Sequence, residues 1–299
     1  MVSDETSKKI TGSIRDSLEK TKKDIPQLAG VVDAFEHLLV KRTIAKFALP
    51  TPNFSNVTID FARFSQGVPV LDDGKIDIEK DSFRKVALLL LPAMRKGFPK
   101  LDAPLSRFES FINESETAID QLLPAIESTD STVLDELARN LDISPTALQF
   151  VCSELAKPFT EKIAEAIAPL IQDVTWLKGY CPVCGAWPEL SSWKGPEGRR
   201  FLNCSVCGHE WTYMRTQCPF CENSDNAKLE IIFSEDRKFE HAELCHECMK
   251  YIVGLDTRNM VNLPHPSAAS LGLIYLDFLA QERGFAPGAT SAWNVLEKI

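Results

Sequence analysis

Length, composition and charge place this chain among ordinary globular proteins. Its 299 residues are 44% hydrophobic and 25% charged, which excludes a disordered, collagenous or small disulfide-stapled chain. The net charge of −9 disfavours a general nucleic-acid binder or a protein that binds anionic membranes. The longest apolar run, residues 86–94, is interrupted by Pro92 and falls far short of the roughly 20 residues that span a bilayer. Because the first residues are polar and acidic, we expect a cytoplasmic protein with no membrane insertion.

Residues 1–175 are expected to form an all-helical domain. Apolar residues recur at helical spacing between proline-rich loops, and a loop is expected after Pro50 and Pro52. Asp81 and Ser82 are the expected cap of one helix, and Ser144 followed by Pro145 is the expected start of the last and longest. The expected helices cover 3–23, 25–49, 81–97, 106–126, 131–141 and 144–170.

The pattern changes at Trp176. Up to about residue 262 the chain consists of short polar segments, glycine turns and aromatic residues, which is typical of small β-hairpins. One hairpin is expected over 189–203 and a second over 229–244. A helix over 267–283 then follows the prolines at 264 and 266.

Eight of the nine cysteines form four Cys-x-x-Cys pairs in this region. In a reducing compartment, such pairs are metal ligands or redox groups more often than structural disulfides. The spacing repeats, with pair, hairpin and pair occurring twice, so two copies of one supersecondary unit are expected. Each loop between pairs is long enough for one hairpin, which favours sequential pairing over a crossed arrangement. The first expected site is Cys181, Cys184, Cys204 and Cys207; the second is Cys218, Cys221, Cys245 and Cys248.

Four thiolates arranged as a tetrahedron suit zinc and iron alike, so the sequence leaves the identity of the two ions open. A zinc site would be structural, whereas an iron site would be redox-active. Gly185 and Gly208 follow the second cysteine of the first two pairs, where a tight turn commonly needs a positive φ. Glu222 and Met249 take these places in the second site, which is therefore expected to be the more labile.

The remaining candidates have simpler interpretations. His209 and His246 lie next to complete sets of four thiols, so they are expected beside the ligands rather than among them. The tryptophans of this region are expected to fill its small core, and Cys152 lies in a helical pattern and is expected to be a buried, inert thiol. Residues 176–262 carry ten Lys and Arg against twelve Asp and Glu, which argues against a nucleic-acid-binding zinc ribbon. No nucleophile–base pair or phosphate-binding glycine loop is apparent, so no catalytic residues and no enzyme activity are expected.

Together these patterns predict an α+β protein with four parts. They are a helical domain over 1–175, a first rubredoxin-like or zinc-ribbon module over 176–216, a second over 217–262, and a C-terminal helix within 263–299.

The four cysteine motifs and their flanks resemble the FdhE family, the formate dehydrogenase accessory proteins. The motifs are Tyr180-Cys-Pro-Val-Cys-Gly-Ala-Trp-Pro188, Cys204-Ser-Val-Cys-Gly-His-Glu-Trp211, Cys218-Pro-Phe-Cys221 and Cys245-His-Glu-Cys-Met-Lys-Tyr251. The resemblance is strongest over about 176–256 and extends to Asp277-Phe-Leu-Ala-Gln-Glu-Arg-Gly284, while Met249 departs from the small residue expected there.

The resemblance implies a cytoplasmic factor needed for maturation of formate dehydrogenase, with an all-helical N-terminal domain and two rubredoxin-like metal modules. Its expected partner is the immature catalytic subunit of that enzyme, which carries molybdenum or tungsten. The eight cysteines carry over as metal ligands, and no catalytic residue is implied. The alternative is a rubredoxin-like electron carrier or redox protein, with iron in the two tetracysteine sites.

Overall fold

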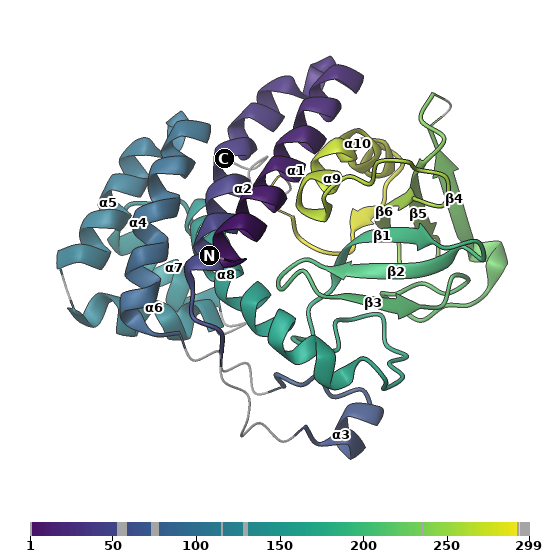
Figure 1. Ribbon diagram of the computed structural model, residues 1–299, viewed down its shortest axis with the longest axis horizontal. Helices are drawn as coiled ribbons and strands as arrows, with labels where there is room; N and C mark the ends of the chain where they lie inside the picture. Colours follow the sequence, from purple (N-terminus) through teal and green to yellow (C-terminus); the bar gives the residue numbers. More distant parts are fainter. Residues whose placement is uncertain are drawn as a thin grey trace. The chain divides into compact units, whose positions relative to one another are not determined.

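The computed structural model describes residues 2–52, 59–72, 78–114, 116–127, 131–234, 236–291 and 293 (Figure 1). The chain divides into two compact units. The first combines residues 1–51, 73–162 and 292–299, and the second combines 52–72 with 163–291. These units differ from the ranges expected from sequence because a segment of the N-terminal half packs with the cysteine-rich region.

The first unit is helical, as expected. In Figure 1, α1 lies beside α2 and α4 lies beside α5, and α2 also packs against α4. The helices are α1 (Val2–Asp24), α2 (Ala29–Ala48), α4 (Lys80–Gly97), α5 (Asp102–Glu114), α6 (Glu116–Glu127), α7 (Ser131–Asn140) and α8 (Pro145–Ile171), of which residues up to 162 belong to this unit.

Some of the helix ends expected from the sequence are confirmed and others are wrong. The Oγ of Ser144 accepts a hydrogen bond from the Ala147 N–H at 3.1 Å, which confirms Ser144 as the cap of α8. The cap expected at Asp81 and Ser82 is wrong, because α4 begins at Lys80 and the Ser82 hydroxyl donates to the Glu79 carboxylate at 2.6 Å. The single helix expected over 106–126 is two helices, α5 and α6.

A buried ion pair joins α2 to α8. Arg42 Nη1 lies 2.8 Å from Glu154 Oε2, and Lys157 Nζ lies 2.9 Å from the other carboxylate oxygen. The Glu154 side chain is 1% exposed. Burial alone would raise the pKa of Glu154, but the charges of Lys157 and Arg42 outweigh it and lower the pKa to about 2.

The second unit contains one seven-stranded sheet, in the order β3-β2-β1-β6-β5-β4, with β7 beside β6. The strands are β1 (Pro188–Lys194), β2 (Arg199–Cys204), β3 (Glu210–Tyr213), β4 (Leu229–Phe233), β5 (Glu240–Cys245), β6 (Lys250–Asp256) and β7 (Ala286–Pro287). The β1–β2 and β4–β5 pairs confirm both expected hairpins. Parallel pairing of β1 with β6, which sets Leu190 beside Val253, joins the two cysteine-rich halves in this sheet. The α+β class is therefore confirmed.

One face of this sheet packs against the C-terminal helices. The core between them includes Leu190, Leu244 and Val253 from the strands, and Leu273 and Leu276 from the helical segment. The helix expected over 267–283 is two helices, α9 (Pro266–Gly272) and α10 (Ile274–Glu282), separated at Leu273. Among the described residues, no helix is long and apolar enough to cross a membrane.

The opposite face carries a buried polar network. Arg200 Nη2 lies 2.6 Å from Glu243 Oε2, while the Ser191 hydroxyl donates to Glu243 Oε1 at 2.6 Å. His241 Nε2 lies 3.3 Å from the same oxygen, Oε1. A Cβ on Gly254 would lie 2.5 Å from His241 Nε2, so this strand position must be glycine. The network links β1, β2 and β5 across the junction of the two halves.

Replacing Arg42 with Met should lower the free energy of unfolding of the helical unit by about 3–5 kcal/mol, because the buried Glu154 carboxylate would lose one of its two partner cations. Arg15→Met is the matched control. It removes an exposed pair with Glu36 at 3.8 Å and should cost less than about 1 kcal/mol. Urea unfolding followed by circular dichroism at 222 nm would measure both, and equal losses would contradict the prediction.

The same carboxylate predicts a dependence on pH. Its pKa is lowered from 4.5 to about 2 in the folded chain, so its contribution is complete above pH 4.5 and is lost as the pH falls toward 2. The difference in stability between the native chain and Arg42→Met should therefore shrink over that interval in the same unfolding experiment.

Candidate metal centres

The first four cysteines meet at one end of the β1–β2 hairpin. Cys181 and Cys184 lie in the turn that precedes β1, Cys204 ends β2, and Cys207 lies in the turn before β3. Their four Sγ atoms lie within 4.8 Å of one another. The Sγ atom of Cys184 lies 3.5 Å from those of both Cys204 and Cys207, and the Cys181–Cys207 separation is 3.6 Å.

The other four cysteines repeat this arrangement. Cys218 and Cys221 lie in a turn before β4, Cys245 ends β5, and Cys248 lies in the turn that leads into β6. All four Sγ atoms again lie within 4.8 Å of one another. The Cys218–Cys248 and Cys221–Cys245 separations are both 3.7 Å. The cysteines thus group sequentially rather than in the crossed arrangement.

These separations fit a tetrahedral metal site. All eight cysteines are free, and sulfur atoms joined in a disulfide would lie only about 2.05 Å apart. A zinc–sulfur bond of about 2.3 Å corresponds to a tetrahedron with edges of about 3.8 Å. The sulfur–sulfur separations of 3.5–3.7 Å are close to that edge. Both groups could therefore hold a metal ion, and the geometry suits zinc and iron equally.

The turns that present the sulfurs share one backbone design. The residue after the second cysteine donates its N–H to the carbonyl of the first cysteine, as Gly185 does to Cys181 at 2.9 Å. This residue has a positive φ in all four turns, 75° at Gly185, 64° at Gly208, 59° at Glu222 and 54° at Met249. The positive φ expected at the two glycines is confirmed. Glu222 and Met249 adopt it despite their side chains, which costs about 1–2 kcal/mol at each position.

Three cysteines of the first group have shifted pKa values. Burial raises the pKa of Cys181, and hydrogen bonding to the neighbouring thiols raises that of Cys207. Hydrogen bonds with the side chains of Cys181, Cys204 and Cys207 hold the pKa of Cys184 well below the usual range. Four thiolates this close together repel one another, and a divalent ion would allow all four to ionise.

The two sites differ in exposure. Three cysteines of the first site are buried and only Cys184 is partly exposed, whereas Cys221 in the second site is exposed and Cys248 is partly exposed. Competing chelators and water therefore have easier access to the second site, which also contains the two strained turns.

The turns of the two sites pack directly against each other. The Trp187 and Phe220 rings lie 5.7 Å apart, and Lys178 Nζ lies 2.9 Å from Glu222 Oε1. Gly179 approaches Pro219 so closely that a Cβ would lie 1.9 Å from the Pro219 carbonyl oxygen. The Cys218–Cys221 turn is thus held by residues that flank the first site.

Residues from far earlier in the chain brace the first site. Val70 and Leu71 donate their N–H groups to the carbonyls of Pro182 and Val183, each at 2.9 Å, and Tyr180 donates its hydroxyl to the Gly67 carbonyl at 2.7 Å. This segment follows α3 (Phe61–Ser65), a short helix within the stretch that was expected to be loop. The side chain of Asp60 caps α3, so an N-cap residue at this position was the local sequence signal for this helix.

Residues 180–215 match the family model described as FdhE, central domain, a span that contains the first cysteine group. A protein FdhE homolog from Aquifex aeolicus is 25% identical over 88% of both chains, and one from Haemophilus influenzae strain PittGG is 36% identical over 36% of this chain and 35% of that one. The crystal structure of the FdhE protein from Pseudomonas aeruginosa matches 95% of this chain and 94% of its own at 19% identity, with a TM-score of 0.59, which shows a shared fold.

The sequence and the fold of this chain are thus similar to those of FdhE proteins. The helical region and the sheet of this chain share the fold of that FdhE structure along most of the chain.

The other candidates expected from the sequence are not among the eight clustered cysteines. Cys152 is buried, and burial raises the pKa of its thiol to about 12, as suits an inert side chain. His246 Nε2 lies 2.9 Å from the Glu230 carboxylate, and the His209 ring stacks on Trp211 with their centroids 6.5 Å apart. Trp176, Trp193 and Trp211 are buried in the second unit, whereas Trp187 is exposed beside Phe220.

The residue with a positive φ in each turn should influence how fast its site releases a bound ion. Met249→Gly relieves about 1 kcal/mol of backbone strain and should slow release from the second site about fivefold. Gly208→Met should accelerate release from the first site by a similar factor. Release from zinc-reconstituted chain to EDTA would be followed with a colorimetric zinc indicator, and the native chain should show a faster second-site phase. Equal rates at the two sites would contradict this difference.

Gly179→Ala should cost the second site its metal, although Gly179 lies next to the first. The added Cβ would collide with Pro219 and displace the turn that holds Cys218 and Cys221. After zinc loading and gel filtration, elemental analysis should find about half the zinc of the native chain. Gly30→Ala is the control, because a Cβ there meets nothing within 4 Å. Full zinc content in Gly179→Ala would show that the packing between the turns does not support the second site.

Proposed function

We propose that this chain is a cytoplasmic accessory factor that recognises the immature catalytic subunit of formate dehydrogenase and assists its maturation. The observation that carries the proposal is the pair of tetracysteine groups in a chain similar to FdhE proteins. The family resemblance supplies the link to formate dehydrogenase, and the geometry supplies the means of building a stable recognition surface.

The eight cysteines are the proposed ligands of two ions, with one set of four thiolates in each half of the sheet. When bound, each ion would cross-link the two turns that present its four ligands, and so contribute folding free energy. The protein's own residues orient the turns: Tyr180 and Leu71 secure the first, and Trp187 and Lys178 secure the second against the first.

We assign no catalytic residues. The Ser191, His241 and Glu243 set superficially resembles a hydrolytic triad. However, the Ser191 hydroxyl donates to Glu243 rather than to the imidazole, and Ser191 and His241 are fully buried. A nucleophile needs a competent base and access to substrate. The Glu243 carboxylate is a weak base because its ion pair with Arg200 lowers its pKa to about 2 despite burial, and the buried Ser191 has no access to substrate. The set is better explained as a structural link between strands.

An electron carrier is the second candidate. The rings of Tyr180 and Trp187 lie 5.8 Å apart, and those of Trp187 and Phe220 lie 5.7 Å apart, so aromatic residues connect the surroundings of the two sulfur groups. This function needs iron that is reduced and reoxidised reversibly, whereas an assembly factor also functions with zinc. Anaerobic reconstitution with iron, followed by optical redox titration, separates the two.

The proposal is tested by an anaerobic pull-down with tagged full-length chain from cells that respire formate, with bound proteins identified by mass spectrometry. The native chain should recover a formate dehydrogenase catalytic subunit, and Cys181→Ser/Cys184→Ser should lose it. Cys152→Ala, which changes a cysteine outside both groups, should recover it as the native chain does. Recovery by the double variant would make the first metal site dispensable for recognition, and failure of the native chain would refute the proposed partner.

A further inference from the structure

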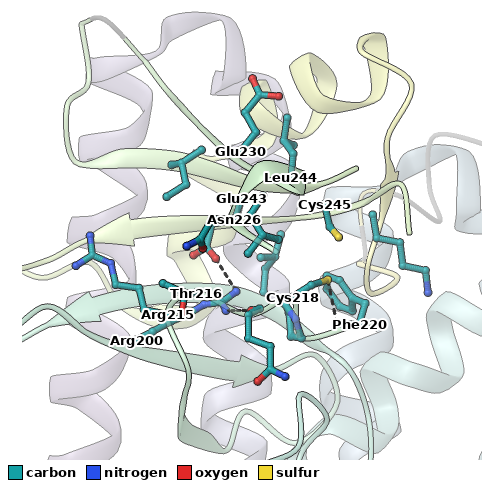
Figure 2. Close-up of a pocket in the computed structure, with 16 residues that line it drawn as sticks. Arg200, Arg215, Thr216, Cys218, Phe220, Asn226, Glu230, Glu243, Leu244 and Cys245 are labelled. Carbon is teal, nitrogen blue, oxygen red and sulfur yellow. Dashed lines mark hydrogen bonds and ion pairs between the residues drawn. The ribbon is translucent and has the colours of Figure 1, made fainter. Parts of the chain in front are cut away.

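The face of the sheet opposite α9 and α10 contains a pocket. It lies between the strands and the segment of residues 215–220, and Figure 2 shows its lining side chains from both. Its volume is about 200 Å³. That is roughly seven water molecules and less than the 300 Å³ at which pockets for whole cofactors begin, so the space suits one or two side chains.

The pocket is largely apolar and has a preformed polar wall. Leu229, Ile231 and Ile252 contribute apolar surface from the strands, and Phe220 contributes it from the covering segment. Arg200 forms its ion pair with Glu243 and also donates to the carbonyls of Met214 and Gln217, at 3.1 and 2.8 Å. Because these bonds tie the sheet to the covering segment, the pocket keeps its shape without a ligand.

The side chain of Arg215 places a positive charge at one end of the pocket. Arg215 lies over the Trp193 ring, 4.2 Å from its centroid, and no carboxylate of the described chain forms an ion pair with it. Arg258 lies over the same ring at 5.9 Å but is paired with Asp256. In Figure 2 Arg215 lies at one end, and Cys218, Phe220 and Cys245 lie at the other. An anionic group would therefore be favoured at the Arg215 end, away from the charge of four thiolates.

The pocket opens beside an edge strand. β4 is the last strand of the sheet, and within the described residues no strand pairs with its outer side. Ile231, which lines the pocket, is 41% exposed, and Phe233 two residues later is 51% exposed. An exposed edge with apolar side chains on alternate residues is a template for an added strand.

We propose that this pocket and the free edge of β4 bind an extended peptide segment of a partner protein. The segment adds to β4 as a strand, places an apolar side chain beside Ile231 in the pocket, and sets an acidic side chain two residues away against Arg215. Side chains two residues apart in a strand share a face, which meets both requirements at once. The inference rests on the pocket and the edge, and it holds whichever protein supplies the segment.

The test uses zinc-loaded full-length chain and two fluorescein-labelled peptides. The first peptide alternates Thr with Leu and Asp, so that Leu and Asp share one face, and the second has Lys in place of Asp. By fluorescence anisotropy the Asp peptide should bind and the Lys peptide should bind at least tenfold more weakly. Arg215→Glu should reverse this preference, because like charges then face the Asp peptide. Lys238→Glu, an exposed charge reversal outside the pocket, should leave both affinities within twofold.

Hydrogen exchange measured by mass spectrometry locates the bound peptide. Residues 229–233 should gain protection when the Asp peptide binds, since the added strand covers the free edge. Failure of the Asp peptide to bind, or equal binding of both peptides to the native chain, would overturn the proposal. So would protection confined to segments other than β4. None of these outcomes bears on the pull-down of formate dehydrogenase, which tests the proposed function separately.

Discussion

The crowding of four sulfur atoms into one small volume is the constraint on which the second unit depends. Sulfurs that lie 3.5–3.7 Å apart are too distant for disulfides, and together they can ionise fully only around a cation. Each group needs two tight turns to converge, and each turn needs a residue with a positive φ. Cys204 ends β2 and Cys245 ends β5. The length and register of each hairpin therefore place its second pair of cysteines next to the first pair.

The two halves are similar in design but unequal in construction. The first has glycine in both positions that need a positive φ, and its sulfurs are mostly buried. Hydrogen bonds with Gly67, Val70 and Leu71 support its first turn. The second has Glu222 and Met249 in those positions. It packs against the first through the contact between the Trp187 and Phe220 rings. The first half is therefore the more strongly supported of the two, and the second is the half expected to release a bound ion more readily.

A single sheet makes the two halves one structural body. Parallel pairing of β1 with β6 unites them, and the Arg200–Glu243 pair crosses the junction on one face while α9 and α10 cover the other. A buried charge pair of this kind adds little stability over an apolar alternative, but it penalises any arrangement that separates its members. It therefore fixes the register of the halves and holds open the pocket between the sheet and residues 215–220.

The sequence by itself determined the α+β class, most helices of the N-terminal region, both hairpins and the sequential grouping of the eight cysteines. These features depend on local periodicity, on turn chemistry and on spacings short enough for a hairpin to close. Tertiary structure alone decided the parallel β1–β6 pairing, the bracing of Pro182 and Val183 by residues 70 and 71, and the meeting of Arg200 with Glu243. Each joins segments that are distant along the chain, and no local pattern records which surfaces will be buried together once the chain has folded.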